Sequence, residues 1–243
     1  MALELTVLGC DGSYAGPDGA CSGYLLTEGD VHVWVDCGPG TLANVQRHVS
    51  LNDITAIVIS HAHPDHWVEL PVTHNALRYF VERRGVPLFA TRETLTRFEA
   101  LKGAPLSETF RPHMISDGSH FDIDGIAFRT SHTDHPVETM AMRIESNGRS
   151  LAYSADTGPG WSLEKLGPVD VALCEATLRP DQAGLAPHLT TTQAGASARA
   201  AGAGRLIITH LPPGADAPAH QAEAADAYGA DVEVATTNAR FTI

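Results

Sequence analysis

Four side chains of metal-binding type occur within six consecutive residues: His61, His63, Asp65 and His66. They follow a short apolar run at 57–59, which is typical of a buried strand. Imidazole nitrogens and carboxylate oxygens are the donors that bind zinc and similar ions. His61 and His63 are two residues apart, so both point to one side of an extended segment. Pro64 then ends that segment, and the adjacent residues 65 and 66 diverge, which indicates two metal ions rather than one.

The composition limits the class of protein. With 243 residues the chain is long enough to bury a substantial core, and we expect one domain over residues 1–243. No run of about 18 apolar residues occurs, so we expect no membrane span. The net charge of −13 disfavours a nucleic-acid polymer as partner, because its phosphate backbone needs a positive surface. A small phosphate substrate stays open, because metal ions supply positive charge locally.

The cysteines and the first residues indicate a compartment. No basic segment followed by an apolar stretch opens the chain, so we expect no secretory signal. The cysteines are scattered without Cys-x-x-Cys spacing, which indicates free thiols in a reducing environment: Cys10, Cys21, Cys37 and Cys174. We therefore expect a cytoplasmic protein.

Strand-like and helix-like segments that could position the cluster recur along the whole chain. Strands are expected at 3–8, 22–26, 31–35, 53–59, 87–90, 110–115, 119–121, 126–131, 140–144, 149–153, 169–174, 205–209 and 232–235. Helices are expected at 41–48, 69–84, 91–101, 191–201 and 218–228. We expect Thr91 to cap the third helix and Thr190 or Thr191 to cap the fourth. The glycine-rich stretch 9–20 lacks a P-loop ending, and we interpret it as a turn at the rim of the site.

The spacing His-x-His-x-Asp-His at 61–66 resembles the signature of the metallo-β-lactamase superfamily. This resemblance implies an α/β fold of the four-layer αββα sandwich type, which the two similar halves of the chain fit. It also implies a set of ligands at strand ends. One metal ion would be held by His61, His63 and His135, the other by Asp65, His66 and His210, with Asp156 and a water or hydroxide bridging them.

Two of these implied positions have alternatives. His132 competes with His135 for the third histidine; we favour His135 because its His-Pro-x-x-Thr context resembles the RNase Z-like and phosphodiesterase-like branch. Asp156 follows the strand at 149–153, where the superfamily keeps its bridging aspartate, although an aspartate also starts turns there. Asp36 resembles the aspartate that supports the ligands from below, and a turn-forming role fits it equally well.

A resemblance to one group within the superfamily extends over nearly the whole chain. The motifs Leu-Gly-Cys near residue 8, Asp-Thr-Gly at 156–158 and Cys-Glu-Ala at 174–176 are similar to an actinobacterial group of atypical class II cyclic-nucleotide phosphodiesterases. RNase Z has the same order, but it carries a histidine where this chain has Cys174 and a long basic arm that is not apparent here. We therefore disfavour tRNA processing. His188 remains available as phosphate binder or leaving-group acid.

These implications predict a metal-dependent hydrolase. Two zinc ions are the default, manganese or iron fit the same donors, and zinc lowers the pKa of bound water to about 7. We expect Asp65, Asp156 and His188 to be catalytic and the substrate to be a small phosphodiester such as a 3′,5′-cyclic nucleotide. A lactonase or thioesterase on the same site is the alternative, because few groups besides His188 and Arg179 could grip phosphate. A non-catalytic metal-binding protein and a flavin-linked diiron protein are weaker readings, and a homodimer is compatible with the resemblance.

Overall fold

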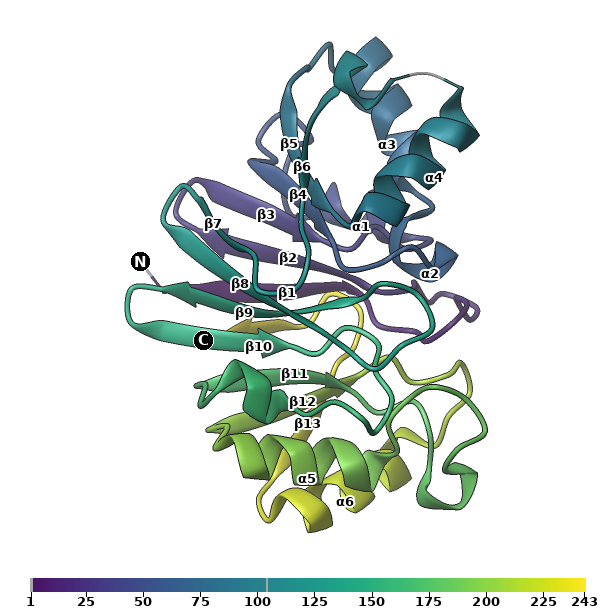
Figure 1. Cartoon of the computed structure of the whole chain (residues 1–243), viewed down its shortest axis with the longest axis vertical. Coiled ribbons are helices and arrows are strands. Elements are labelled where there is room, and N and C mark those ends of the chain that lie inside the picture. Colours follow the sequence, from purple (N-terminus) through teal and green to yellow (C-terminus); the bar gives the residue numbers. More distant parts are fainter. Residues whose placement is uncertain (1, 104) are drawn as a thin grey trace.

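The computed structural model describes residues 2–103 and 105–243. Two seven-stranded sheets lie face to face, and helices cover the outer face of each (Figure 1). The helices of the first half of the chain lie on one side of this pair and those of the second half on the other. The predicted four-layer αββα sandwich is therefore confirmed.

The first sheet has the order β14-β1-β2-β3-β4-β5-β6. Its strands are β1 Glu4–Gly9, β2 Gly23–Glu28, β3 Val31–Val35, β4 Ala56–Ile59, β5 Val86–Ala90, β6 Phe110–Met114 and β14 Arg240–Thr242. The strands β1, β2 and β3 pair in antiparallel fashion, whereas β3, β4, β5 and β6 are parallel. The carboxyl ends of β3 and β4 therefore meet at one edge of this sheet.

The second sheet has the order β13-β12-β11-β10-β9-β8-β7. Its strands are β7 His120–Ile123, β8 Ile126–His132, β9 Met140–Ser146, β10 Arg149–Tyr153, β11 Val171–Glu175, β12 Arg205–Thr209 and β13 Val232–Val234. The strands from β10 to β13 are parallel, so their carboxyl ends also share one edge. The segments that follow these ends carry most of the second half's predicted site residues.

The helices are α1 Thr41–Val45, α2 Pro64–Trp67, α3 Leu70–Asn75, α4 Arg92–Lys102, α5 Thr191–Ala201 and α6 Ala217–Tyr228. Thr91 caps α4 as predicted, because its hydroxyl accepts a hydrogen bond from the Thr94 N–H. Of the two candidates for α5, the structure selects Thr190, whose hydroxyl accepts from the N–H of Gln193. The glutamine side chain binds back to the Thr190 backbone, which completes a capping box.

One expectation about these elements was wrong, and one strand was not predicted. The segment 69–84 is not one helix, because α3 ends at Asn75 and a π-helical turn, Ala76–Phe80, follows it. Leu77 is buried in this turn, but Phe80 is 85% exposed. The apolar residues at helical spacing therefore do not form one buried face, and the predicted helix was too long. The strand β14 was not expected; its three residues are too short for a clear alternation, and its pairing with β1 places it.

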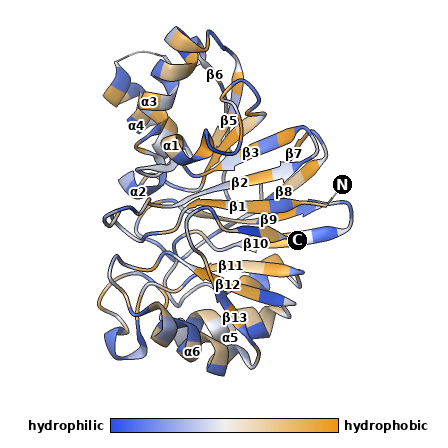
Figure 2. Cartoon of the chain, turned by 180° about the vertical axis from the view of Figure 1, so that it is seen from behind, coloured by the Kyte–Doolittle hydropathy of each residue, from blue (hydrophilic) through white to orange (hydrophobic). Residues whose placement is uncertain are grey.

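Three apolar clusters hold the layers together. One fills the space between the sheets, one lies between the first sheet and α1, α3 and α4, and one lies between the second sheet and α5 and α6. Figure 2 shows the matching pattern of hydrophobic strands and mixed outer helices. All four cysteines are free, as predicted. Within the described ranges, no helix has both the length and the apolar character needed to cross a membrane.

Candidate metal centre

The structure brings the seven predicted ligands together at the strand ends. One group consists of His61, His63, His135 and Asp156; the other consists of Asp65, His66, Asp156 and His210. Within each group, one donor atom from every residue lies within 4.8 Å of the others. His132 is exposed at the end of β8 and lies outside both groups, so the geometry favours His135 over it. That these side chains bind metal stays a prediction, which the following contacts support.

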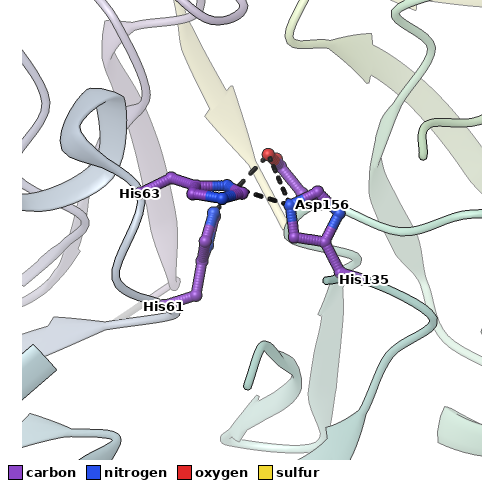
Figure 3. Close-up of side chains that lie close together, drawn as sticks. All are labelled: His61, His63, His135 and Asp156. Carbon is purple, nitrogen blue, oxygen red and sulfur yellow. Dashed lines mark hydrogen bonds and ion pairs between the residues drawn. The ribbon is translucent and has the colours of Figure 1, made fainter. Parts of the chain in front are cut away.

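The first half of the chain delivers its four donors from β4 and α2. His61 and His63 follow β4 directly, and their rings lie at 79° to each other with centroids 5.0 Å apart. Pro64 occupies the first turn of α2, so it ends the extended segment by starting a helix. This helix carries the adjacent Asp65 and His66, which therefore diverge as expected. Figure 3 shows the rings of His61 and His63 facing His135 and Asp156 from the opposite sheet.

The second half delivers His135 from the β8–β9 loop, Asp156 from the segment after β10 and His210 from the end of β12. His210 has φ 60° and Ala155, the neighbour of Asp156, has φ 50°. Residues other than glycine seldom adopt this left-handed region, and such backbone conformations cluster at functional sites. The sharp turns at these strand ends aim the two side chains inward.

Asp156 lies between the two groups and presents one oxygen to each. Its Oδ2 is 3.6 Å from His61 Nε2 and 3.8 Å from His135 Nε2. Its Oδ1 is 3.2 Å from His66 Nε2 and 3.5 Å from His210 Nε2. A carboxylate in this position can give one oxygen to each of two metal ions. The geometry therefore favours the predicted bridging role over a turn-forming one.

Hydrogen bonds behind the histidines fix which ring nitrogen faces the centre. The Ser60 hydroxyl donates to Asp36, so it accepts from His61 Nδ1 at 2.9 Å. The Nδ1 of His135 donates to the carbonyl oxygen of Pro187 at 3.1 Å. Because a neutral imidazole carries one proton, these contacts leave the Nε2 atoms unprotonated and facing the centre, where His135 Nε2 lies 3.0 Å from His63 Nδ1. His210 follows the same rule, with Nδ1 2.9 Å from the Thr177 hydroxyl.

Asp36 holds the predicted ligand His66 and the neighbouring Ser60 by hydrogen bonds, as its resemblance to the supporting aspartate of the superfamily implied. This buried carboxylate accepts hydrogen bonds from His66 Nδ1, the Ser60 hydroxyl and the Tyr153 hydroxyl, each at 2.8 Å. It also accepts from the Ser60 N–H at 2.7 Å. Asp36 adopts φ 59°, which turns the chain under the cluster. Its contacts exceed those of an ordinary turn-forming aspartate.

The donor set fits divalent metal ions. The His61 Nε2 atom is buried and has no hydrogen-bond partner among the described residues. Burial lowers the pKa of His66, but the carboxylates of Asp156 and Asp36 outweigh it and raise the pKa well above its usual value. The buried carboxylates of Asp156 and Asp36 thus favour a positive charge between them, and a bound metal ion would supply this charge.

A hydrogen-bonded pair of His188 and Glu175 lies at the border of the centre. His188 Nδ1 lies 2.9 Å from Glu175 Oε1, and the His188 ring stacks on that of His210 with centroids 5.2 Å apart. Burial lowers the pKa of His188, but the hydrogen bond and charge of Glu175 outweigh it and raise the pKa to about 9. Glu175 was not predicted from the sequence as a site residue. Its signal was a strand-end carboxylate in the same parallel set of strands as Asp156 and His210.

Two other predicted features have different outcomes. Cys174 is buried, and burial together with the charge of Glu175 raises the pKa of its thiol to about 12, which disfavours proton transfer by this side chain. Arg179 forms an ion pair with Glu223 of α6, and its Nε donates to this carboxylate at 3.0 Å. Arg179 is therefore engaged away from the cluster, and the structure does not favour it as a phosphate ligand.

The glycine-rich loop packs against the centre and donates to it. The Ser13 N–H donates to Asp65 Oδ2 at 3.0 Å. A Cβ added at Gly12 would lie 2.5 Å from the His210 carbonyl oxygen and 2.9 Å from its Nδ1. This close approach explains why the loop needs glycine at this position, and the rim location predicted for it is confirmed.

Gly12→Ala should therefore displace His210. We expect activity to fall by about 10- to 100-fold, the loss typical of disturbing the surroundings of a metal ligand. The measurement is hydrolysis by metal-loaded protein, with circular dichroism to check the fold. Pro17→Ala in the same loop is the matched control, because Pro17 is exposed. Equal activity of Gly12→Ala and Pro17→Ala would contradict the prediction.

Comparison with known proteins identifies the class. The pattern of the β-lactamase superfamily domain matches residues 32–211, so the chain belongs to the metallo-β-lactamase superfamily. The chain is 34% identical to the Mycobacterium tuberculosis protein Rv1339 over 230 residues, which cover 88% of this chain and 82% of that protein. It is 30% identical over 242 residues to ribonuclease Z of Mycobacterium bovis, covering 87% and 86% of the two chains.

A particular solved relative is similar over the whole fold. The probable metallo-hydrolase YhfI of Bacillus subtilis is 30% identical over 218 residues, which cover 86% of this chain and 87% of YhfI. Its crystal structure aligns with a TM-score of 0.90 and 25% identity over 99% of both chains. This chain is thus a metallo-β-lactamase-fold hydrolase of the RNase Z-like branch, with a candidate His/Asp metal centre. Members of this superfamily typically bind divalent metals.

Proposed function

We propose that the protein is a dinuclear metal-dependent phosphodiesterase that hydrolyses a small phosphodiester such as a 3′,5′-cyclic nucleotide. The observation that carries this proposal is Asp156, whose two oxygens face two separate groups of histidines. A bridging carboxylate supports two adjacent metal ions, and two-metal sites suit phosphoryl transfer. Superfamily β-lactamases usually lack this bridge, which argues against that activity.

The proposed roles of the residues follow from their contacts. His61, His63 and His135 would hold one ion; Asp65, His66 and His210 would hold the other. Bound metal ions would lower the pKa of a water molecule and offset the charge of the phosphate. Zinc is the default ion, with manganese or iron as alternatives for these N/O donors. His188, fixed by Glu175 at the border of the centre, would meet the phosphate or the leaving oxygen.

The charge of the chain supports a small substrate. A net charge of −13 disfavours the extended contact with a phosphate backbone that a tRNA substrate requires. The buried Cys174 also stands where RNase Z has its proton-transferring histidine. Ribonuclease Z similarity therefore supports phosphodiester chemistry, while these differences argue against the tRNA substrate.

A lactonase or thioesterase is the second candidate. This candidate is supported by the small number of side chains that could bind a phosphate group, since Arg179 forms an ion pair with Glu223. The same metal chemistry can act on a carboxylic ester, because the fold does not fix the reaction.

One comparison of substrates tests both candidates. Protein loaded with zinc or manganese is offered 3′,5′-cyclic AMP, an acyl-homoserine lactone and an acyl thioester, with His63→Ala as the blank. We expect hydrolysis of the cyclic nucleotide by the wild type, loss of this activity in the variant, and little lactone or thioester cleavage. Lactone or thioester cleavage without cyclic-nucleotide turnover, in protein with two bound metal ions, would replace the phosphodiesterase by the second candidate.

A further inference from the structure

Two buried tyrosines join the sheets directly beneath the metal centre. The Tyr153 hydroxyl, on β10 of the second sheet, donates to Asp36 Oδ2 at the end of β3 in the first sheet, at 2.8 Å. The Tyr24 hydroxyl, on β2 of the first sheet, lies 2.7 Å from the Thr209 hydroxyl on β12 of the second. Tyr24 and Tyr153 are 1% and 3% exposed. Each sheet therefore contributes one tyrosine whose hydroxyl reaches a residue of the other sheet.

Each of these contacts ends next to a predicted metal ligand. Asp36 holds His66 through its Nδ1 at 2.8 Å. Thr209 immediately precedes His210. The Nε2 atoms of His66 and His210 face each other at 3.4 Å, although they come from different sheets. The tyrosines are thus linked to two ligands that must meet across the boundary between the sheets.

The rings of the tyrosines also contact each other. Their centroids are 5.1 Å apart, and the planes meet at 62°, the edge-to-face arrangement that aromatic pairs prefer. The residues around them in the inter-sheet cluster are otherwise apolar, such as Leu26 and Leu173. Apolar contact is not directional, so it leaves the relative position of two sheets loosely defined. Hydrogen bonds need a defined distance and angle. The tyrosine hydroxyls add two such bonds inside the core to those at its edges, where the Met140 N–H donates to the Ser60 carbonyl oxygen and Arg205 donates to the Thr242 carbonyl oxygen.

We propose that Tyr153 and Tyr24 are positioning residues that set the two sheets in the register at which their metal ligands meet. Among the described residues, neither hydroxyl forms a hydrogen bond with a predicted metal ligand. Tyr153 acts on His66 through Asp36, and Tyr24 acts on His210 through Thr209. This inference rests on the two-metal site of the proposed function.

The test is zinc affinity in the variants Tyr153→Phe and Tyr24→Phe. Phenylalanine keeps the ring, and Asp36 retains its hydrogen bonds from Ser60 and His66, so we expect Tyr153→Phe to fold. Zinc binding is measured by competition with a chromophoric chelator, which yields the number of ions and the dissociation constant of each. We expect Tyr153→Phe to bind at least one of two ions about tenfold more weakly, the lower end for residues that support a ligand. Tyr24→Phe should weaken binding less, because Thr209 reaches His210 only through the backbone, whereas Asp36 hydrogen-bonds the His66 ring directly.

Tyr228→Phe is the matched control. The Tyr228 hydroxyl donates to the carbonyl oxygen of Ala203 at 2.6 Å, at the end of α6, so its loss removes one partly buried hydrogen bond at the outer helix layer. The melting temperature of each metal-free variant separates a loss of stability from a loss of metal affinity. If Tyr153→Phe binds both ions as tightly as Tyr228→Phe does, the positioning role is overturned. Wild-type protein that binds fewer than two ions would overturn the proposed two-metal function instead, before any variant is compared.

Discussion

Asp156→Ala should abolish hydrolysis and remove at least one metal ion from the protein. We expect a loss larger than the roughly 100-fold upper range seen when a partner of a metal ligand is removed, because Asp156 faces both groups of histidines directly. Burial raises the pKa of Asp156, but the electrostatic interactions with His210, His66 and His61 outweigh it and hold the pKa well below its usual value. The side chain is therefore an anion between the two groups, and alanine removes that charge.

The measurements are metal content after gel filtration and the rate of cyclic-nucleotide hydrolysis. Asp226→Ala is the matched control, since Asp226 is exposed on α6 and its loss changes the net charge equally. A protein that has lost Asp156 and still turns over substrate at the wild-type rate with two ions per chain would remove the bridging role, and with it the observation that carries the proposed function.

The local part of the site could be predicted from the sequence, because its spacing is local. His61 and His63 share a side of one extended segment, and Pro64 determines where that segment ends. Asp156 and His210 were predicted from the resemblance to the superfamily. The structure gives the physical reason, since each follows a strand of one parallel set whose carboxyl ends share an edge. His135 and His132 could not be separated in this way, because they lie near one loop and only its path decides which side chain turns inward.

The remaining site residues depend on how the two sheets pack. Tyr24 and Tyr153 have the sequence pattern of ordinary core residues, and nothing local indicates that their hydroxyls cross to the opposite sheet. Glu175 shows its role only through the approach of His188, thirteen positions along the chain. The fold shows the same limit, since the π-helical turn after α3 and the short β14 are fixed by tertiary contacts rather than by local pattern.

The second large effect concerns His188. In hydrolysis of a 3′,5′-cyclic nucleotide, a water oxygen bonds to phosphorus, the bond from phosphorus to a ribose oxygen breaks, and that oxygen must gain a proton. We expect His188 to donate it from Nε2, because Nδ1 is held by Glu175 at 2.9 Å. General acid catalysis of this kind contributes about 10²- to 10⁴-fold, so His188→Ala should slow cyclic-nucleotide hydrolysis by that factor.

A substrate whose leaving group needs no proton separates this role from phosphate binding. p-Nitrophenolate departs as an anion, so His188→Ala should act far less severely on bis(p-nitrophenyl) phosphate than on the cyclic nucleotide. Glu175→Gln, which removes the charge but can still accept a hydrogen bond from Nδ1, should show the same selectivity in weaker form. His32→Ala is a control for loss of a histidine, since its ring contacts Thr27 at the β2–β3 hairpin. Equal losses on both substrates would assign His188 to binding the phosphate, because a phosphate ligand contributes whatever the leaving group is.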